Sequence, residues 1–217
     1  MTFFEIVSIL ARGAGFTILV TLACILTGFF SGLLAALLFR LDIRPLNWLL
    51  HTFTYTFRGI PLLVILFLVF FGLPSIGLPI PPLVAMMLSL GLICGAYLSE
   101  VFRSALEAVD PNELMAAQSM GMRRIQILTA IEIPQMLRFS APGMLNEFTT
   151  VLKYSPFAYT VGVPEILKEA TSLALTTLRG MEIYLAVGVL YFLIYKIMME
   201  IFLWVERRHA IPGFKQI

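Results

Sequence analysis

The sequence predicts an all-α integral membrane protein with five transmembrane helices and a helical cytoplasmic segment between the third and the fourth. Hydrophobic residues make up 59% of the 217 residues and charged residues only 13%, against roughly 45–50% and about 25% in soluble domains. The mean hydropathy is +0.94. Because a spanning helix needs about 20 mostly apolar residues, we expect residues 1–217 to form a single transmembrane domain.

Hydropathy and the positions of turn-forming residues place the five spans along the chain. The first is expected to stay uncleaved, because Glu5 stands where a signal peptide carries basic residues. The fourth is interrupted by Asn146, Glu147 and Lys153. The expected spans are residues 13–39, residues 61–71 extended backward through 48–57, and residues 83–102, 134–157 and 183–205.

The distribution of basic residues predicts the orientation, since cytoplasmic flanks collect Lys and Arg. With five spans, eleven basic residues fall on one side: Arg40, Arg44, Arg58, Arg103, Arg123, Arg124, Arg138, Lys196, Arg207, Arg208 and Lys215. Three fall on the other, Arg12, Lys168 and Arg179, and Lys153 is left out as intramembrane. This predicts an outside N-terminus and a cytoplasmic C-terminus.

Several classes of function lack their motifs in this sequence. No GxxxxGK followed by Ser or Thr occurs, so the chain is not expected to hydrolyse ATP by itself. His51 and His209 stand far apart without Cys or carboxylate residues at metal-ligand spacing. Cys24 and Cys94 lie in apolar stretches and are interpreted as small core residues. We expect no catalytic residue, no metal, no cofactor bound by this chain and no nucleic-acid partner.

The charged segment 111–133 follows the third span and is the main interruption of the apolar pattern. Asp110 and Pro111 close the preceding helix, and Asn112 is the predicted N-cap of a short helix that Gly121 ends. A second helix is expected over residues 122–133. From periodicity alone, an amphipathic loop lying at the lipid interface is an equal alternative.

The same segment carries a resemblance to a known family. Its residues fall on the spacing of the EAA motif, which marks the permease subunits of ATP-binding-cassette importers; they are Ala116, Ala117, Gly121, Ile131, Ile133 and Pro134. Four further stretches, 57–74, 95–103, 133–147 and 161–167, resemble the polar amino acid uptake branch of these importers. The resemblance extends along most of the chain between Arg12 and Arg208.

The resemblance implies a type I importer permease fold in which residues 111–133 form the coupling loop that docks on a separate ATPase. The motif's usual Glu is Met115 here, and Glu113 lies about 200° round the helix from it. The implied docking residues are Met115, Ala116, Ala117, Met120, Gly121 and Met122. The implied partners are an ATPase dimer that holds ATP and Mg²⁺, a second permease, an extracytoplasmic binding protein facing residues 161–172, and the lipid of the bacterial inner membrane.

Charged groups inside a bilayer usually face a bundle interior or a water-filled path. Glu100 is expected to pair with Arg103 one turn away, whereas Lys153 either lines the path or a subunit interface, or extends its amine to the membrane surface. The resemblance implies a substrate pocket beside Ile93 and Cys94 on the third span and beside residues 154 and 155. The predicted substrate path comprises Ile93, Tyr97, Glu100, Lys153, Tyr154 and Ser155.

The predicted function is the alternating-access import of a polar amino acid or related small solute, driven by ATP. Because Ile93, Cys94 and Tyr154 replace the polar residues that members of the family often carry, one alternative is the weakly binding or non-binding half of a heterodimeric permease pair. An ion-driven secondary transporter and a membrane scaffold without transport are further alternatives. Gly28 and Gly32 form a GxxxG pattern that predicts close helix packing.

Overall fold

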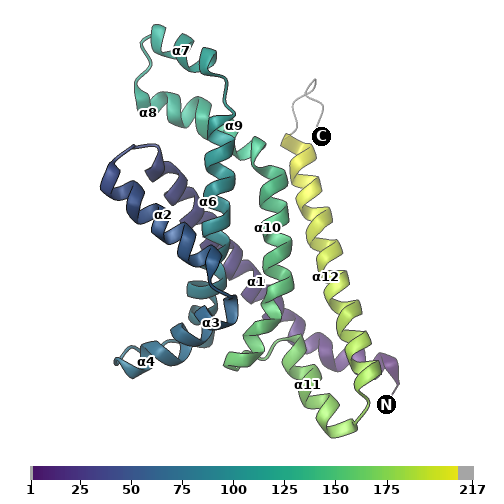
Figure 1. Ribbon diagram of the computed structural model, residues 1–217. Helices are drawn as coiled ribbons and strands as arrows, with labels where there is room; N and C mark the ends of the chain where they lie inside the picture. Colours follow the sequence, from purple (N-terminus) through teal and green to yellow (C-terminus); the bar gives the residue numbers. More distant parts are fainter. Residues whose placement is uncertain (1, 210–217) are drawn as a thin grey trace. The chain divides into compact units, whose positions relative to one another are not determined.

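The computed structural model describes residues 2–209, which fold into helices joined by turns, without a strand in that range (Figure 1). Lys215, counted above with the cytoplasmic charges, lies outside the described residues. Contacts divide the chain into two compact units, one of residues 23–151 and one of residues 1–22 with 152–217. The long helix α1 (Phe3–Phe39) contributes residues to both units.

The unit of residues 23–151 contains the second half of α1 and the helices that follow it. These are α2 (Arg44–Gly59), α3 (Leu62–Phe67), η1 (Leu68–Gly72), α4 (Leu73–Ser75), α5 (Pro82–Met86), η2 (Met87–Gly91), α6 (Leu92–Glu107), α7 (Pro111–Ser119), α8 (Arg124–Ile127), η3 (Leu128–Glu132), α9 (Ile133–Phe139) and most of α10 (Ala141–Tyr154). The elements η1, η2 and η3 are π-helical turns that continue their α-helical neighbours. The predicted all-helical fold class is confirmed.

Close packing of α1 on α6 forms the centre of this unit. A Cβ atom on Gly28 would lie 2.5 Å from the Cys94 Sγ, and one on Gly32 would lie 2.8 Å from the Gly95 carbonyl oxygen. Any larger residue at either position would force the helices apart. The packing role predicted for the GxxxG pattern is confirmed, and so is the core position of both cysteines, which are buried.

The second predicted span is not one straight helix. Helix α2 and the helical run from Leu62 to Ser75 meet at 107°, although the sequence between Trp48 and Phe71 was expected to cross as one span. Pro61 has no N–H to continue the helical ladder, and it disfavours a helical conformation at Ile60. Ile60 accordingly adopts an extended backbone, with φ −96° and ψ 133°.

The third and fifth predicted spans are confirmed as long apolar helices, over Pro82–Glu107 and Gly180–Val205. With α1 they give three helices able to cross a membrane by length and composition among the described residues, or four with the bent pair. The fourth predicted span corresponds to α9 and α10, which are separated by a turn at Ser140. The count of five spans therefore stays a prediction.

The other unit comprises the first half of α1, η4 (Ser155–Val161), α11 (Ile166–Thr177) and α12 (Gly180–His209), and its core packs α1 against α11 and α12. Its core contains these buried residues: Ile6, Leu10, Ile166, Ala170, Ile183, Ala186 and Val187. Gly13 permits the contact of α1 with α11, since a Cβ there would lie 2.6 Å from the backbone nitrogen of Ile166. The rest of α12 exposes large apolar side chains, as a lipid-facing helix does.

Candidate functional site

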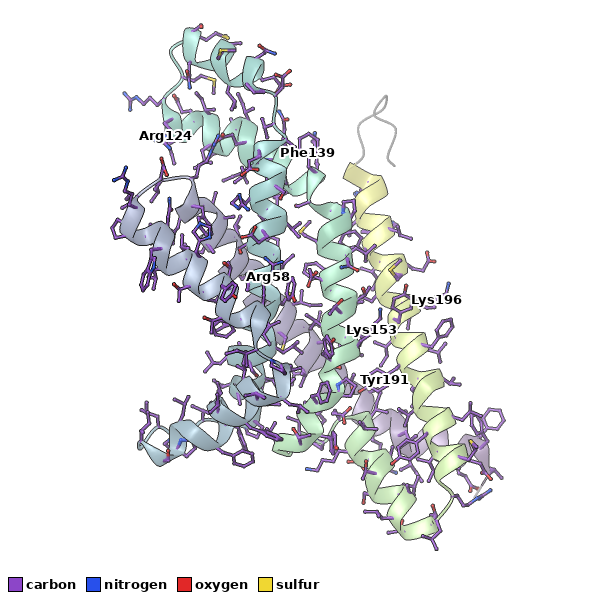
Figure 2. All side chains as sticks on the ribbon, viewed as in Figure 1. Arg58, Arg124, Phe139, Lys153, Tyr191 and Lys196 are labelled. Carbon is purple, nitrogen blue, oxygen red and sulfur yellow. The ribbon has the colours of Figure 1, made fainter. Side chains whose placement is uncertain are left out.

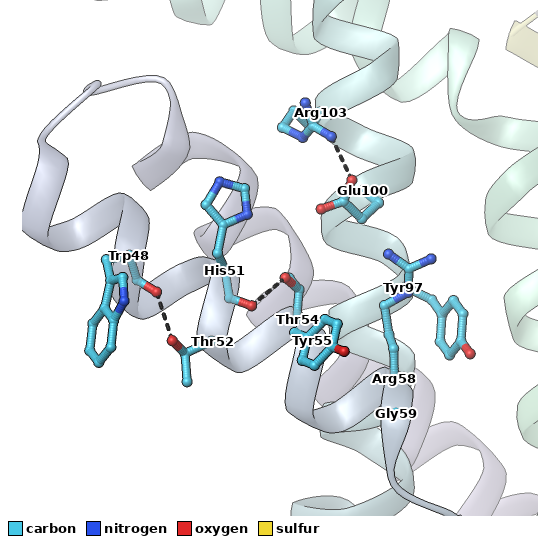
Figure 3. A pocket seen from close by; sticks show the side chains of 10 residues that line it. All are labelled: Trp48, His51, Thr52, Thr54, Tyr55, Arg58, Gly59, Tyr97, Glu100 and Arg103. Atoms are coloured by element: carbon cyan, nitrogen blue, oxygen red, sulfur yellow. Dashed lines mark hydrogen bonds and ion pairs between the residues drawn. The ribbon is translucent and has the colours of Figure 1, made fainter.

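An open cavity of about 860 Å³, lined by polar and aromatic residues, lies on the unit of residues 23–151, between α2 and α6 (Figure 3). Ten residues line it: Trp48, His51, Thr52, Thr54, Tyr55, Arg58 and Gly59 from α2, and Tyr97, Glu100 and Arg103 from α6. This volume is within the range of small-molecule sites. The mixture of charged, hydroxyl and aromatic side chains is unusual for a surface between two helices of a membrane protein.

The sequence of α2 explains why one side of the cavity is polar. His51, Tyr55 and Arg58 recur at intervals of four and three residues and so share a face. Leu50 and Thr54 are the buried residues of the helix, and they lie to one side of this face, where Thr54 also lines the cavity. A helix with such a polar face is not suited to contact with lipid tails along its whole circumference, so this face must line a water-filled space or a protein partner.

Helix α6 carries three charged residues that form ion pairs with one another. The Arg103 guanidinium donates to the Glu100 carboxylate at 2.6 Å and to the Glu107 carboxylate at 3.0 Å. The predicted pair of Glu100 with Arg103 is therefore confirmed. Because Glu100 already has a guanidinium partner, its charge is balanced within α6 itself.

Arg58 occupies the last turn of α2, where the second span bends (Figure 2). Its guanidinium carbon lies 4.9 Å from the centre of the Tyr97 ring, within the range of a cation–π contact. Within the described part of the chain, Arg58 makes no hydrogen bond or ion pair. Glu147 of α10 lies within electrostatic range of it.

Two of the predicted path residues, Tyr97 and Glu100, line this cavity, and Ile93 one turn earlier on α6 does not. The α2 wall was not predicted. Residues 48–57 were predicted to be a backward extension of the second span, and Arg58 was counted as a cytoplasmic charge. The polar residues spaced three and four apart between Trp48 and Arg58 were the available signal.

The remaining predicted path residues belong to the unit that contains residues 152–209. Lys153 and Tyr154 are exposed there, and the Tyr154 ring stacks on Phe157 with centroids 6.0 Å apart. Ser155 is buried, and its hydroxyl donates to the Leu152 carbonyl oxygen at 2.9 Å. Helix α10 ends before Pro156, where the chain continues as the 3₁₀ helix η4.

A buried carboxylate anchors α11 in the same unit. Glu165 is fully buried and caps α11 by accepting from the Lys168 backbone N–H at 2.8 Å. The Tyr191 hydroxyl of α12 donates to its other oxygen at 2.6 Å (Figure 2). Burial raises the pKa of the Glu165 carboxyl, and the hydrogen bond from Tyr191 opposes that shift. The sequence did not predict that Tyr191 would be the partner of Glu165.

The 111–133 segment consists of α7, a glycine turn, α8 and η3, as predicted in outline. The N-cap is Asp110 and not Asn112, because the Asp110 carboxylate accepts from the Asn112 N–H at 2.8 Å while Pro111 occupies the first helical position. Gly121, with φ +80°, ends α7. The Met122 N–H bonds to the Ala117 carbonyl and the Gly121 N–H to the Gln118 carbonyl, which is a Schellman motif.

The predicted docking residues differ in exposure. Met115 is 56% exposed and Met120 is 84% exposed, whereas Ala117 is only 5% exposed. Ala116 and Gly121 are exposed, and Met122 is partly buried. The segment therefore offers two methionine side chains to a partner, and Ala117 packs inside the segment itself.

Three contacts connect the 111–133 segment to its own unit. Arg40 at the end of α1 forms an ion pair with Glu132 of η3. The Arg124 guanidinium donates to the Arg40 carbonyl oxygen at 2.8 Å. The Gln135 amide donates to the Glu113 carboxylate at 2.5 Å, which links α9 with α7.

Metal-binding groups were not expected, and residues 2–209 contain no cluster of three or more His, Cys, Asp or Glu side chains arranged to hold a metal ion.

Comparison with known proteins gives the same family from sequence and from structure. Residues 25–210 match the family model described as the inner membrane component of binding-protein-dependent transport systems. The chain is 34% identical to the probable amino-acid permease protein YxeN of Bacillus subtilis over 86% of each chain. It is 32% identical to the probable glutamine ABC transporter permease protein GlnP of the same species, over 81% of this chain and 82% of GlnP.

A solved structure of an amino acid ABC transporter with histidines superposes with a TM-score of 0.85 at 29% identity, covering 96% of this chain and 99% of the other. The sequence and the fold thus indicate the same family. The chain belongs to the family of inner-membrane components of binding-protein-dependent transport systems, as an amino-acid ABC transporter permease subunit.

Proposed function

We propose that this chain is the membrane-spanning subunit of an importer that moves a polar amino acid or related small solute from an extracytoplasmic binding protein into the bacterial cytoplasm. The proposal rests above all on the open cavity between α2 and α6, whose charged and hydroxyl side chains suit a water-soluble cargo within a membrane protein. Two permeases, identical or siblings, would rest on two ATPase subunits that bind ATP and Mg²⁺.

In this proposal the 111–133 segment faces the cytoplasm and docks on an ATPase subunit, and the N-terminus lies outside. The orientation rests on the excess of basic residues along one side of the predicted spans. Docking is supported by the exposed side chains of Met115 and Met120, since methionine is enriched at protein interfaces.

The contacts of the segment suggest how ATP binding would reach the cargo path. Movement of the segment would pull on α1 through Glu132 and Arg40, and on α9 through Glu113 and Gln135. Helix α1 in turn packs directly on α6, which carries one wall of the cavity. ATP-driven approach of two such segments would open the path outward, and hydrolysis would return it to the inward state.

The test is to purify the chain from its native membranes and to assay the purified material with candidate binding proteins from the same organism. We expect an ATPase to co-purify and its ATP hydrolysis to rise when the binding protein is loaded with L-glutamine or L-histidine, the amino acids named for two of the similar proteins. A chain that purifies without any ATPase and takes up solute along an ion gradient would instead be a secondary transporter.

A second candidate is the weakly binding half of a permease pair. It is favoured by Ser155, whose buried hydroxyl is already bonded to the Leu152 carbonyl and so is not offered to a cargo. The subunit composition of the purified complex distinguishes the two. Two copies of this chain per complex would contradict the pairing with a sibling.

A further inference from the structure

A second cavity, of about 520 Å³, lies in the 111–133 segment and the start of α9. Helix α7 folds back beside α8 (Figure 1), and an open groove remains between α7, η3 and α9. We refer to this space as the segment groove. Its lining includes Ala116 of α7, Met120 at the end of α7, Ala130 and Ile131 of η3, and Pro134 and Arg138 of α9.

The walls of the segment groove are mostly apolar, and they are open to the outside. Ala116, Met120 and Ala130 all line the groove and are all exposed. Because Ala116 and Ala130 have small side chains, they leave the space between α7 and η3 unfilled. An apolar depression of this kind on an exposed surface is where the side chain of a protein partner is most fully removed from water.

The polar end of the groove has one charged group without a partner. The Glu113 carboxylate is held by the Gln135 amide. Arg138, one turn further along α9, also lines the groove and is exposed, and it forms no ion pair within the described part of the chain. A guanidinium can bind a carboxylate through two N–H groups. The groove therefore fits an apolar side chain that has a carboxylate beside it.

The position of the groove indicates which partner would supply these groups. Met120 lines the groove, and it is also one of the two methionines that the segment exposes for docking. The groove and the docking surface are thus continuous. A protein that covers Met120 also reaches the opening of the groove.

We propose that the segment groove receives an apolar side chain of the ATPase subunit, and that Arg138 binds an Asp or Glu of the same subunit beside it. This inference rests on the proposed function, in which the segment docks on an ATPase. It adds that the contact is reciprocal, since a side chain of the ATPase enters the permease. It also extends the contact from residues 115–122, implied by the sequence, to η3 and α9.

Protection of a thiol in the groove is the direct test. Cys24 and Cys94 are both buried, so Ala130→Cys supplies the one exposed thiol in the part of the chain that the structure describes. The full-length permease in detergent is labelled with a water-soluble maleimide, alone and with the ATPase that co-purifies with it. We expect the ATPase to slow the labelling of Ala130→Cys about tenfold or more, because a filled groove excludes water.

Thr129→Cys is the matched control for this measurement. Thr129 is the neighbouring residue of η3, and it is exposed but does not line the groove. Labelling of Thr129→Cys should remain nearly as fast with the ATPase as without it.

Filling the groove should weaken the same contact. Ala130→Trp places a large ring in the groove and should weaken binding of the ATPase to the immobilised permease about tenfold or more. Ala130→Ser leaves the groove open and should bind the ATPase as the wild type does. The thermal midpoint of each isolated variant shows whether it is folded. The labelling test adds only a small side chain, so it decides the question even if Ala130→Trp does not fold.

The charge at the end of the groove is tested separately. Arg138→Gln should weaken binding of the ATPase about threefold to tenfold, and it should also make the affinity less dependent on salt. Arg123→Gln is the control. It removes an equal charge from an exposed residue of the same segment that does not line the groove, and it should change neither quantity.

The groove contact is overturned if the ATPase binds but leaves the labelling of Ala130→Cys unchanged, or if folded Ala130→Trp binds the ATPase as tightly as the wild type. Labelling of Ala130→Cys that is slow without the ATPase and becomes fast after removal of bound lipid would assign the groove to a lipid instead. Equal losses in Arg138→Gln and Arg123→Gln would overturn the role of Arg138. None of these results removes the ATPase from the wild type, so the import function would stand. A wild-type permease that purifies without any ATPase would overturn the proposed function itself.

Discussion

Arg40 and Glu132 form an ion pair between the end of α1 and the 111–133 segment, across 92 positions of sequence. The Glu132 side chain is 7% exposed and that of Arg40 is 41% exposed. The backbone of Arg40 is held as well, since Arg124 donates to its carbonyl oxygen. Helices α8 and η3, which follow Gly121, are therefore held against the end of α1 by side-chain contacts, in addition to the covalent connection through the intervening chain.

Removing one partner of this pair should destabilise the protein and weaken coupling. Glu132→Gln and Arg40→Gln should each cost about 1–2 kcal/mol, less than for a fully buried pair because water screens Arg40. Uptake should fall more than ATP hydrolysis does. A double-mutant cycle on thermal unfolding measures the interaction, and strictly additive effects of the two substitutions would show that the pair contributes nothing.

Met120 and Ala117 should respond differently to the same new charge. Met120→Asp changes a side chain that is 84% exposed, so the permease should keep its thermal midpoint while the ATPase binds about tenfold more weakly, as expected for loss of an apolar interface contact. Ala117→Asp places a carboxylate at a position only 5% exposed and should lower the thermal midpoint of the permease itself.

Co-purification of the ATPase and thermal unfolding of the isolated permease separate these two effects. If Met120→Asp retained the ATPase as well as the wild type does, the exposed methionine would not be part of the docking surface.

The glycine turn after α7 should be sensitive to a single methyl group. Gly121 has φ +80°, and a Cβ atom there would meet nothing within 4 Å, so the cost of Gly121→Ala is purely conformational, about 1 kcal/mol. Gly15→Ala is the matched control. It also adds a Cβ atom into open space, but inside the helix α1, where alanine is preferred. Thermal unfolding should show a loss for the first variant and no loss for the second.

The buried carboxylate of α11 should give the protein a pH dependence. Because burial raises the pKa of Glu165 above its ordinary value of 4.5, the folded state binds that proton more tightly than the unfolded state. Its contribution to stability is present at low pH and is lost as the pH rises through the raised pKa. The thermal midpoint should therefore decrease as the pH rises above about 4.5, and Glu165→Gln should remove this decrease.

Tyr191→Phe tests the same carboxylate from the other helix. The substitution deletes the donor 2.6 Å from Glu165 and leaves a buried oxygen short of a partner, a loss of about 1–3 kcal/mol. The total loss of stability with rising pH should become larger, since the hydrogen bond that favoured the charged form of Glu165 is gone. A midpoint that is equal to that of the wild type at every pH would show that the contact is unimportant.

Long apolar helices and local turn chemistry were predictable from sequence. The runs that form α12 and the helix from Pro82 to Glu107 are apolar over more than the length of a span, and Gly121 carries its own turn signal. The bend at Ile60 was missed, although Pro61 marks it, because hydropathy remains high on both sides of the break.

The contacts that build the candidate site could not be predicted from one sequence. Nothing in the spacing of Arg40 and Glu132 indicates that they meet, nor that the polar face of α2 lies against α6. Such pairings depend on tertiary packing between segments far apart in the chain. Local periodicity could identify the face on which His51, Tyr55 and Arg58 lie, but not the cavity in front of it.

The central claim is ATP-driven import, and uptake into proteoliposomes tests it most directly. Vesicles would contain the permease–ATPase complex, with ATP and Mg²⁺ inside and with binding protein and labelled L-glutamine or L-histidine outside. The account predicts that one or both amino acids accumulate above the outside concentration, and that uptake stops when either ATP or the binding protein is omitted. Uptake that proceeds equally well without ATP, or no uptake of either amino acid, would contradict it.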